Sequence, residues 1–342
     1  MFKTYEKYLI KNFTKKFFLI SIIFLCLIII LSILEEISFF KELDENIFYP
    51  YLLTFLSSPI TLFEIFPFIF LISTQYLFFD LFKKEEITLL KINGLSNLKI
   101  IKILFFTSIF IGIFTVLIFY NSASKLKFLY TDIKNNFSND NKNLAVVNNS
   151  GLWLKDEIND TIVIVKSTNI DNNYLKNVVI NEFDKDFEIK RIIQSETVDI
   201  DKKKWIVKKP TITINNISNN PSEDLLFLTN FDNEKIYKLF SNVSTLNILE
   251  LFNLKKDYEN LGYSSDEIQI HILKLFLSPY LFALMTVFSS IIMINIKKNK
   301  SIFFNIILGI FISVLIYYFN FVFLSLGNTG KIPPSVSVFL PV

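Results

Sequence analysis

Residues 17–34 read FFLISIIFLCLIIILSIL, an apolar run of eighteen residues without a charge, a glycine or a proline. A run of about 18 or more apolar residues can cross the hydrocarbon core of a membrane as a helix. The run is longer than the ~7–15-residue core of a cleaved signal peptide, and Glu35 and Glu36 follow it in place of a small-residue cleavage site. It therefore predicts a membrane-spanning helix that is not removed.

Four further apolar stretches satisfy the same length rule, which gives five complete spans in a chain of 342 residues. Hydrophobic residues make up 51% of the chain and charged residues 20%, a larger apolar share than one soluble core needs. We therefore expect an α-helical integral membrane protein rather than a simple soluble enzyme. The four stretches are residues 59–82, 100–120, 275–296 and 301–326.

The lysines of the short loops are concentrated on one side of these spans. Residues 1–16, 83–99 and 297–300 together hold twelve lysines, whereas the opposite short loops hold only Lys41 and Lys331. Lysine-rich short loops stay on the cytoplasmic side of a membrane. The N-terminus is therefore predicted to be cytoplasmic, and the long segment between the third and fourth spans is predicted to lie outside.

That outer segment, residues 121–267, has the pattern of a soluble β domain. Apolar and polar residues alternate in it, as at residues 205–208, and turn-forming residues interrupt the pattern at a spacing of roughly 8–12 residues, typical of a sandwich or jelly roll. From Leu246 the apolar spacing becomes helical and predicts a short stalk. Residues 1–120 then form a three-span region and residues 268–342 a region with two complete spans. The expected strands are residues 144–147, 152–155, 161–166, 177–183, 187–190, 205–208 and 212–214.

The chain lacks most of the residues that enzymes and metal sites use. One cysteine, Cys26, and one histidine, His271, exclude a Cys/His metal centre, and His271 stands among isoleucines, where a structural role is expected. Residues 327–331 are too short for a phosphate-binding loop, so ATP-driven work would need another chain. Because Arg191 is the only arginine, a nucleic-acid partner is not expected either. We expect no catalytic residue, no metal and no cofactor.

The inner loop between the second and third spans reads KKEEITLLKINGLS over residues 83–96. Its two acidic residues lie in the first turn of a predicted short helix over residues 84–94, and Lys91 lies in the last turn, as the helix dipole favours. Gly94 can adopt the left-handed conformation after the helix, and Ser96 can cap the third span. Two interpretations remain open: an ordinary amphipathic loop helix, or a lever that docks on a cytoplasmic partner.

Three separated motifs resemble those of the LptF/LptG family, the permeases of the lipopolysaccharide export ABC transporter, and are most similar to its LptG branch. The inner loop is similar to the SELxxLRxxGxS coupling helix, with Glu85 in place of the usual serine. Residues 151–156, GLWLKD, are similar to the GxWLKD opening strand of the outer domain. Residues 330–341 resemble the G-x-PP…A-x-W-L-P approach to the last helix, with Phe339 in place of tryptophan. The coupling-helix residues at matching positions are Glu86, Leu90, Lys91, Gly94 and Ser96.

The resemblance implies a multi-pass half-permease of the bacterial inner membrane. Such a subunit pairs with an LptF-like paralogous permease, binds a cytoplasmic LptB-like ATPase dimer and extracts lipopolysaccharide from the inner membrane. Its periplasmic jelly roll would pass the lipid to LptC-like and LptA-like periplasmic jelly-roll proteins at the open sheet edge between residues 146 and 216. The family has six spans, and this sequence stops at Val342, where the sixth would begin, so we expect a truncated or absent sixth span.

The resemblance also implies binding residues. Lys41 and Lys274 are the available cations near the outer membrane boundary and could contact lipopolysaccharide phosphates, although each could instead be an interface anchor. Lys274 lies five residues before Pro279, whereas the family's lysine usually lies four residues before its proline. The implied ATPase-coupling residues are Glu85, Glu86, Leu89, Leu90, Lys91 and Gly94.

Two other classes remain open. A membrane-anchored periplasmic sensor or scaffold protein would explain the order of helices and strands without transport, but it would need no docking helix. A membrane enzyme acting on lipid would need an acid/base or metal cluster at the interface, and the sequence shows none. Co-purification of an ATPase that is lost on altering Glu86 or Gly94 would separate a transporter from both.

Overall fold

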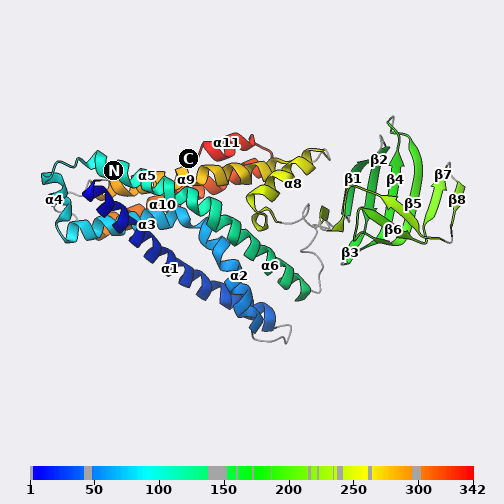
Figure 1. Cartoon of the computed structure of the whole chain (residues 1–342), viewed down its shortest axis with the longest axis horizontal. Helices are drawn as coiled ribbons and strands as arrows, with labels where there is room; N and C mark the ends of the chain where they lie inside the picture. Colours follow the sequence, from blue (N-terminus) through cyan, green and yellow to red (C-terminus); the bar gives the residue numbers. More distant parts are fainter. Residues whose placement is uncertain are drawn as a thin grey trace. The chain divides into compact units, whose positions relative to one another are not determined.

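The computed structural model describes residues 3–41, 48–137, 152–158, 161–171, 173–185, 187–214, 217–221, 223–233, 235–236, 242–260, 264–294 and 302–342. The chain divides into two compact units, one helical and one built on a β-sheet (Figure 1). The helical unit comprises residues 1–130, 243–252 and 265–342, and the β unit comprises residues 131–242 and 253–264. The expected strand at residues 144–147 and the motif residue Gly151 lie outside the described residues.

Five helices are long and apolar enough to cross a membrane within the part of the chain that the structure describes, as the sequence predicted. They are α1 Thr4–Lys41, α3 Phe66–Lys83, residues 97–134 of the continuous helix that starts with α5, α9 Asp266–Ile294 and residues 303–328 of α10. The helices and helical turns are α1 Thr4–Lys41, α2 Phe48–Glu64, α3 Phe66–Lys83, α4 Glu86–Ile92, α5 Asn97–Phe114, the π-helix η1 Thr115–Tyr120, α6 Asn121–Phe137, the 3₁₀ turn η3 Val243–Thr245, α8 Ile248–Asn260, α9 Asp266–Ile294, α10 Ile302–Asn328 and α11 Pro334–Phe339.

The second predicted span, residues 59–82, differs from the structure. The chain forms two helices there, α2 and α3, which separate at Ile65. Pro67, near the start of α3, explains the break, because proline has no backbone N–H and its ring clashes with the carbonyl of the residue four positions earlier. Pro59, by contrast, lies inside α2.

The third predicted span, residues 100–120, belongs to a longer helix. Helix α5 passes without a break through the π-helix η1 into α6, which ends at Phe137. The helix therefore continues for seventeen residues beyond residue 120, where the sequence placed the domain boundary. The polar α6 sequence continues in helical conformation because it contains no proline or glycine that would end it.

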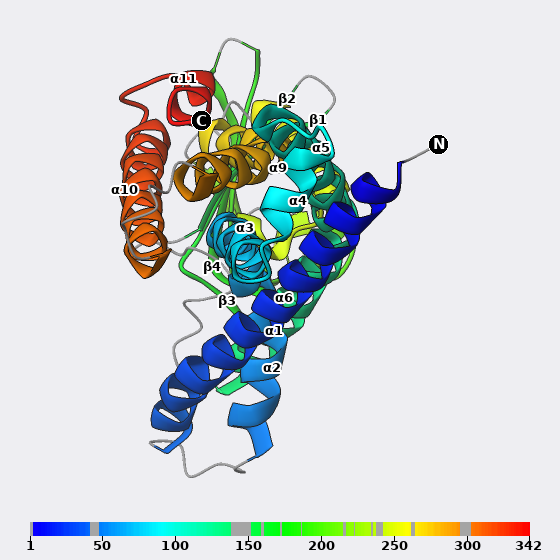
Figure 2. The same cartoon turned by 90° about the vertical axis from the view of Figure 1, so that its left-hand side faces the viewer.

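Helices α3 and α9 lie between α1 and α10 in the helical unit (Figure 2). The ring of Phe70 on α3 lies 4.7 Å from the ring of Phe17 on α1 and 4.9 Å from the ring of Phe282 on α9, measured between centroids. Gly112 lets α5 approach α9 closely, because a Cβ at this position would lie 2.8 Å from the Cα of Pro279. Small residues at such contacts are typical of membrane helix packing.

Among the described residues, the β unit is a nine-stranded antiparallel sheet with the principal order β1-β2-β4-β5-β6-β9. Strand β5 pairs with β7 through residues 192–194 and with β6 through residues 197–199, so the sheet divides at β5. The all-β character expected of this segment is confirmed, and burial alternates in β6, where Trp205 and Val207 are buried. The strands are β1 Leu152–Ile158, β2 Thr161–Ser167, β3 Asn169–Asp171, β4 Tyr174–Phe183, β5 Ile189–Asp199, β6 Lys204–Lys208, β7 Thr211–Ile214, β8 Ile217–Asn219 and β9 Leu225–Leu228.

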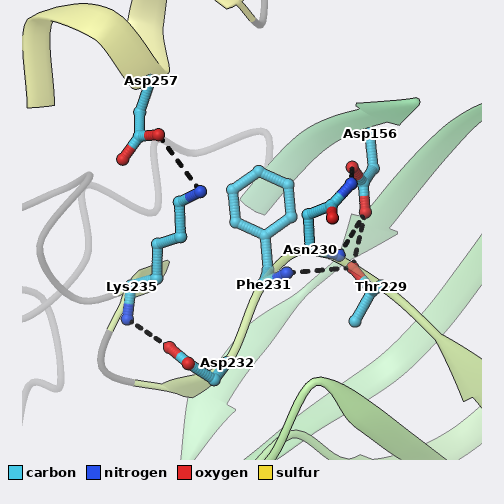
Figure 3. A network of polar contacts seen from close by, with 7 residues as sticks. All are labelled: Asp156, Thr229, Asn230, Phe231, Asp232, Lys235 and Asp257. Atoms are coloured by element: carbon cyan, nitrogen blue, oxygen red, sulfur yellow. Dashed lines mark hydrogen bonds and ion pairs between the residues drawn. The ribbon is translucent and has the colours of Figure 1, made fainter. Parts of the chain in front are cut away.

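A buried carboxylate joins the two ends of that strand order (Figure 3). Asp156 on β1 is 4% exposed and accepts hydrogen bonds from Thr229 Oγ1 at 2.7 Å, Asn230 N at 2.9 Å and Asn230 Nδ2 at 2.8 Å, just after β9. In the same region, Lys235 forms an ion pair with Asp257 of α8 at 3.1 Å. The aspartate of the GLWLKD motif therefore has a structural role in closing the β unit.

Candidate functional site

The predicted coupling helix is α4, which lies between two spans at one end of the helical unit (Figure 1). It spans residues 86–92 and is shorter than the predicted residues 84–94. Glu86 lies in its first turn and Lys91 in its last turn, as expected. Glu85, however, is the N-cap and has left-handed backbone with φ of 55°, so it does not belong to the first turn.

The end of α4 has the left-handed glycine and the serine cap that the sequence predicted. Gly94 has a φ of +82°, and its N–H donates to the carbonyl of Lys91 at 3.0 Å. The N–H of Leu95 donates to the carbonyl of Leu90 at 3.1 Å, which completes a Schellman motif. Ser96 then accepts a hydrogen bond from the N–H of Lys99 and caps α5, so both sequence predictions are confirmed. These contacts fix the direction in which α4 projects from the spans.

The two faces of this hairpin differ in exposure. Ile87 and Leu95 are buried and anchor it to the helical unit. Leu89 and Ile92 are 57% and 76% exposed, although both are apolar. Leu90 was predicted as a coupling residue and is half-buried. Ile92 was not predicted as one, yet it lies on the exposed side with Leu89. An exposed apolar pair held by a buried one is suited to contact with another protein.

The carboxylate of Glu86 faces α1. The hydroxyl of Tyr8 donates to Glu86 Oε2 at 2.5 Å across 78 residues of sequence. A second polar contact joins α1 to the helix that precedes α4: Lys16 on α1 forms an ion pair with Asp80 on α3. Sequence reasoning treated Lys16 as one of the cytoplasmic lysines and did not single out Tyr8. The signal that could have indicated a contact between α1 and α4 was the pair of acidic residues that follows the second span, together with the lysine-rich start of the chain.

Lys274 of α9 lines a cavity of about 150 Å³ in the helical unit. Glu64 at the end of α2 and Asn320 on α10 add two further polar groups to walls that are otherwise mainly apolar. Lys41 is the exposed last residue of α1 and is not among the residues that line this cavity. The structure therefore does not bring the two predicted lipid-binding lysines into one cavity. The remaining lining residues are Phe63, Pro67, Ser278, Leu281, Phe282, Tyr317, Phe321 and Leu324.

His271 has the structural role expected from the sequence. Tyr120 is buried at the end of the π-helix, and its hydroxyl lies 2.8 Å from His271 Nε2 and donates to the carbonyl of Leu246 at 3.0 Å. A hydroxyl carries one proton, and Tyr120 donates it to Leu246. His271 Nε2–H is therefore the donor in the bond between His271 and the Tyr120 oxygen. Asn121 Oδ1 accepts from Ile248 N at 3.1 Å beside it. Three distant segments meet here: the end of the third span, the start of α8 and α9.

Among the described residues, His, Cys, Asp and Glu form no group of three or more that could hold a metal ion. The residues of the two regions above are suited to binding a protein and an amphiphile: an exposed apolar hairpin, and a mainly apolar cavity that Lys274, Glu64 and Asn320 also line.

Comparison with known proteins agrees with the motifs. A search among curated proteins finds no match. The family model described as lipopolysaccharide export system permease LptF/LptG matches residues 7–342, nearly the whole chain. The match includes the helices before the β unit, the β unit itself and the helices after it. This chain therefore belongs to the LptF/LptG family of lipopolysaccharide export permeases.

Proposed function

We propose that the chain is the LptG-like subunit of a lipopolysaccharide exporter, extracts the lipid from the inner membrane and is driven by a separate ATPase. The observation that carries the coupling part of this proposal is the α4 hairpin, which exposes Leu89 and Ile92 while Ile87 and Leu95 hold it in place. An apolar helix that projects between two spans gives a cytoplasmic ATPase a defined docking surface through which its conformational change can act on the spans. The subunit itself contributes no catalytic group in this proposal.

The lipid would be held by the two features that an anionic amphiphile needs. Lipopolysaccharide carries acyl chains and phosphates, and the cavity beside Lys274 offers mainly apolar walls with one cation, although the carboxylate of Glu64 lines it as well. Charge-assisted bonds from lysine to phosphate are strong where water is partly excluded. Lys41, at the outer end of α1, would serve as a second phosphate contact on the path of the lipid.

The predicted orientation supports the same scheme. The lysine-rich loops would put α4 in the cytoplasm, where an LptB-like ATPase dimer would dock, and the β unit in the periplasm. The exposed apolar faces of α1 and α10 would meet lipid and an LptF-like paralogue. The partner edge was expected between residues 146 and 216. Within the described strands, β9 at residues 225–228 lies outside that range, pairs only with β6 and exposes Leu226 and Leu228, which suits addition of a strand from an LptC-like or LptA-like jelly roll.

The test is a detergent pull-down of the tagged chain with its paralogue and ATPase. We expect the Leu89→Ser/Ile92→Ser variant and Glu86→Ala each to lower the co-purified ATPase about tenfold, because hot-spot contacts of this kind contribute ≳1–2 kcal/mol. Ile217→Ser is the matched control, since Ile217 is an equally exposed isoleucine on β8 of the other unit.

Retention of the ATPase by the Leu89→Ser/Ile92→Ser and Glu86→Ala variants would contradict docking at α4. If the unaltered chain purifies with no ATPase at all, a periplasmic sensor or scaffold becomes the better description of the protein.

A further inference from the structure

Two polar contacts connect the inner half of α1 to the α3–α4 hairpin. At the first, the hydroxyl of Tyr8 donates to Glu86 Oε2 at 2.5 Å. A hydrogen bond to a charged acceptor is among the stronger ones in proteins. It links the first turns of α1 to the first turn of α4, the helix on which the proposed ATPase would act.

The second contact lies two turns further along α1. Lys16 forms an ion pair with Asp80, and its ammonium lies 3.8 Å from the centre of the Tyr76 ring. The side chains of Lys16 and Asp80 are only 20% and 27% exposed, so water screens this pair less than an ordinary surface pair. The added cation–π contact fixes the direction of the lysine side chain.

Apolar packing of α1 on α3 accompanies the two polar contacts. Leu9, Phe13 and Phe17 of α1 are buried, and the rings of Phe13 and Phe17 lie 6.3 Å and 4.7 Å from the ring of Phe70 on α3. The inner part of α1 is therefore held against α3 along its length. The outer part of the same unbroken helix packs on α2, where the ring of Phe40 stacks on that of Tyr49, and exposes an apolar face at Leu27, Ile30, Leu31 and Leu34.

We propose that Tyr8 and Lys16 are positioning residues that make α1 move together with the coupling hairpin. This inference rests on the proposed function. A displacement of α4 would act on α1 through Glu86 and Tyr8, while Lys16 and Asp80 would prevent α1 from sliding along α3. The stroke of the ATPase would then reach the outer half of α1, and the α2 helix packed on it, through one continuous helix. Glu86 would have two roles, one toward the ATPase and one toward Tyr8.

The first test removes one oxygen atom. Tyr8→Phe is introduced into the complete transporter complex in nanodiscs, and ATP hydrolysis is measured with and without lipopolysaccharide. We expect the ATPase to co-purify as before, whereas the lipid-stimulated rate falls about tenfold, in line with loss of one hydrogen bond to a charged group. Tyr5→Phe is the matched control, because Tyr5 lies on the same helix and contacts only Lys3 among the ring contacts described.

The second test uses charge reversal. Lys16→Asp and Asp80→Lys should each reduce the lipid-stimulated rate, and the double variant, which restores an ion pair in the opposite sense, should recover most of it. A merely structural loss of packing would not be repaired by exchanging the two charges.

The outcomes separate this inference from the proposed function. Two results would show that the link between α1 and α4 is not part of coupling. One is a lipid-stimulated ATPase rate of Tyr8→Phe equal to that of the unaltered complex. The other is a rate of the charge-reversed double variant no higher than the rates of the single variants. If the ATPase fails to co-purify with the unaltered chain, the proposed function itself fails, and the link loses its role with it.

Discussion

At the scale of single residues, Asp156 illustrates how a motif can be recognised without its role being apparent. Its carboxylate accepts three hydrogen bonds and is almost fully buried. Removal of such an acceptor leaves buried donors without partners, which is costly. The sequence identified the aspartate as part of a family motif, but the partner segment after β9 lies more than seventy residues away, beyond any local pattern.

Asp156→Ala should therefore destabilise the β unit by about 2–4 kcal/mol relative to the unaltered chain. Both tryptophans of the protein lie in this unit, and Trp205 is buried with its Nε1 bonded to the carbonyl of Phe231 at 2.9 Å. In a Trp153→Phe background, Trp205 fluorescence of the full chain during urea unfolding measures the loss. Exposed Glu196 on β5 provides the control variant, Glu196→Ala. An unchanged midpoint for Asp156→Ala would contradict the structural role.

At the scale of elements, α4 shows which features local chemistry determines. Glycine after a short helix and serine before the next one predicted the left-handed residue and the cap, because both depend on neighbours within a few residues. The break between α2 and α3 could have been placed from Pro67, but the apolar run hid it. The contact of Tyr8 with Glu86 could not be predicted, since it depends on how α1 packs on the hairpin.

Gly94 tests the geometry of this element directly. Nothing lies within 4 Å of a Cβ built on it, so a substitution acts through the φ of +82° and not through a clash. Gly94→Val should strain the hairpin by about 1–2 kcal/mol and lower ATPase co-purification several-fold, whereas Gly94→Asn should be nearly neutral, since asparagine tolerates the left-handed region. Equal loss for both variants would show that the side chain, rather than the backbone conformation, is what matters.

At the scale of the whole molecule, the order of elements was the most predictable feature. Apolar length predicted five spans, and alternation predicted an inserted β domain, because both signals accumulate over many residues. The extent of the third helix was not predicted, since α6 is polar and its helical state depends on continuation from α5. The coupling hairpin and the Lys274 cavity both belong to the helical unit. We propose that ATP hydrolysis by a separate ATPase docked on the hairpin moves lipid through that unit.

The measurement that tests this claim most directly is transfer of lipopolysaccharide out of proteoliposomes. The chain is reconstituted with its paralogue and ATPase, and lipid that reaches a soluble periplasmic jelly-roll acceptor is quantified with and without ATP. We predict transfer that requires ATP and falls to background for Glu86→Ala, while the two permease chains still assemble. Transfer that is independent of ATP, or unchanged in Glu86→Ala, would contradict the account.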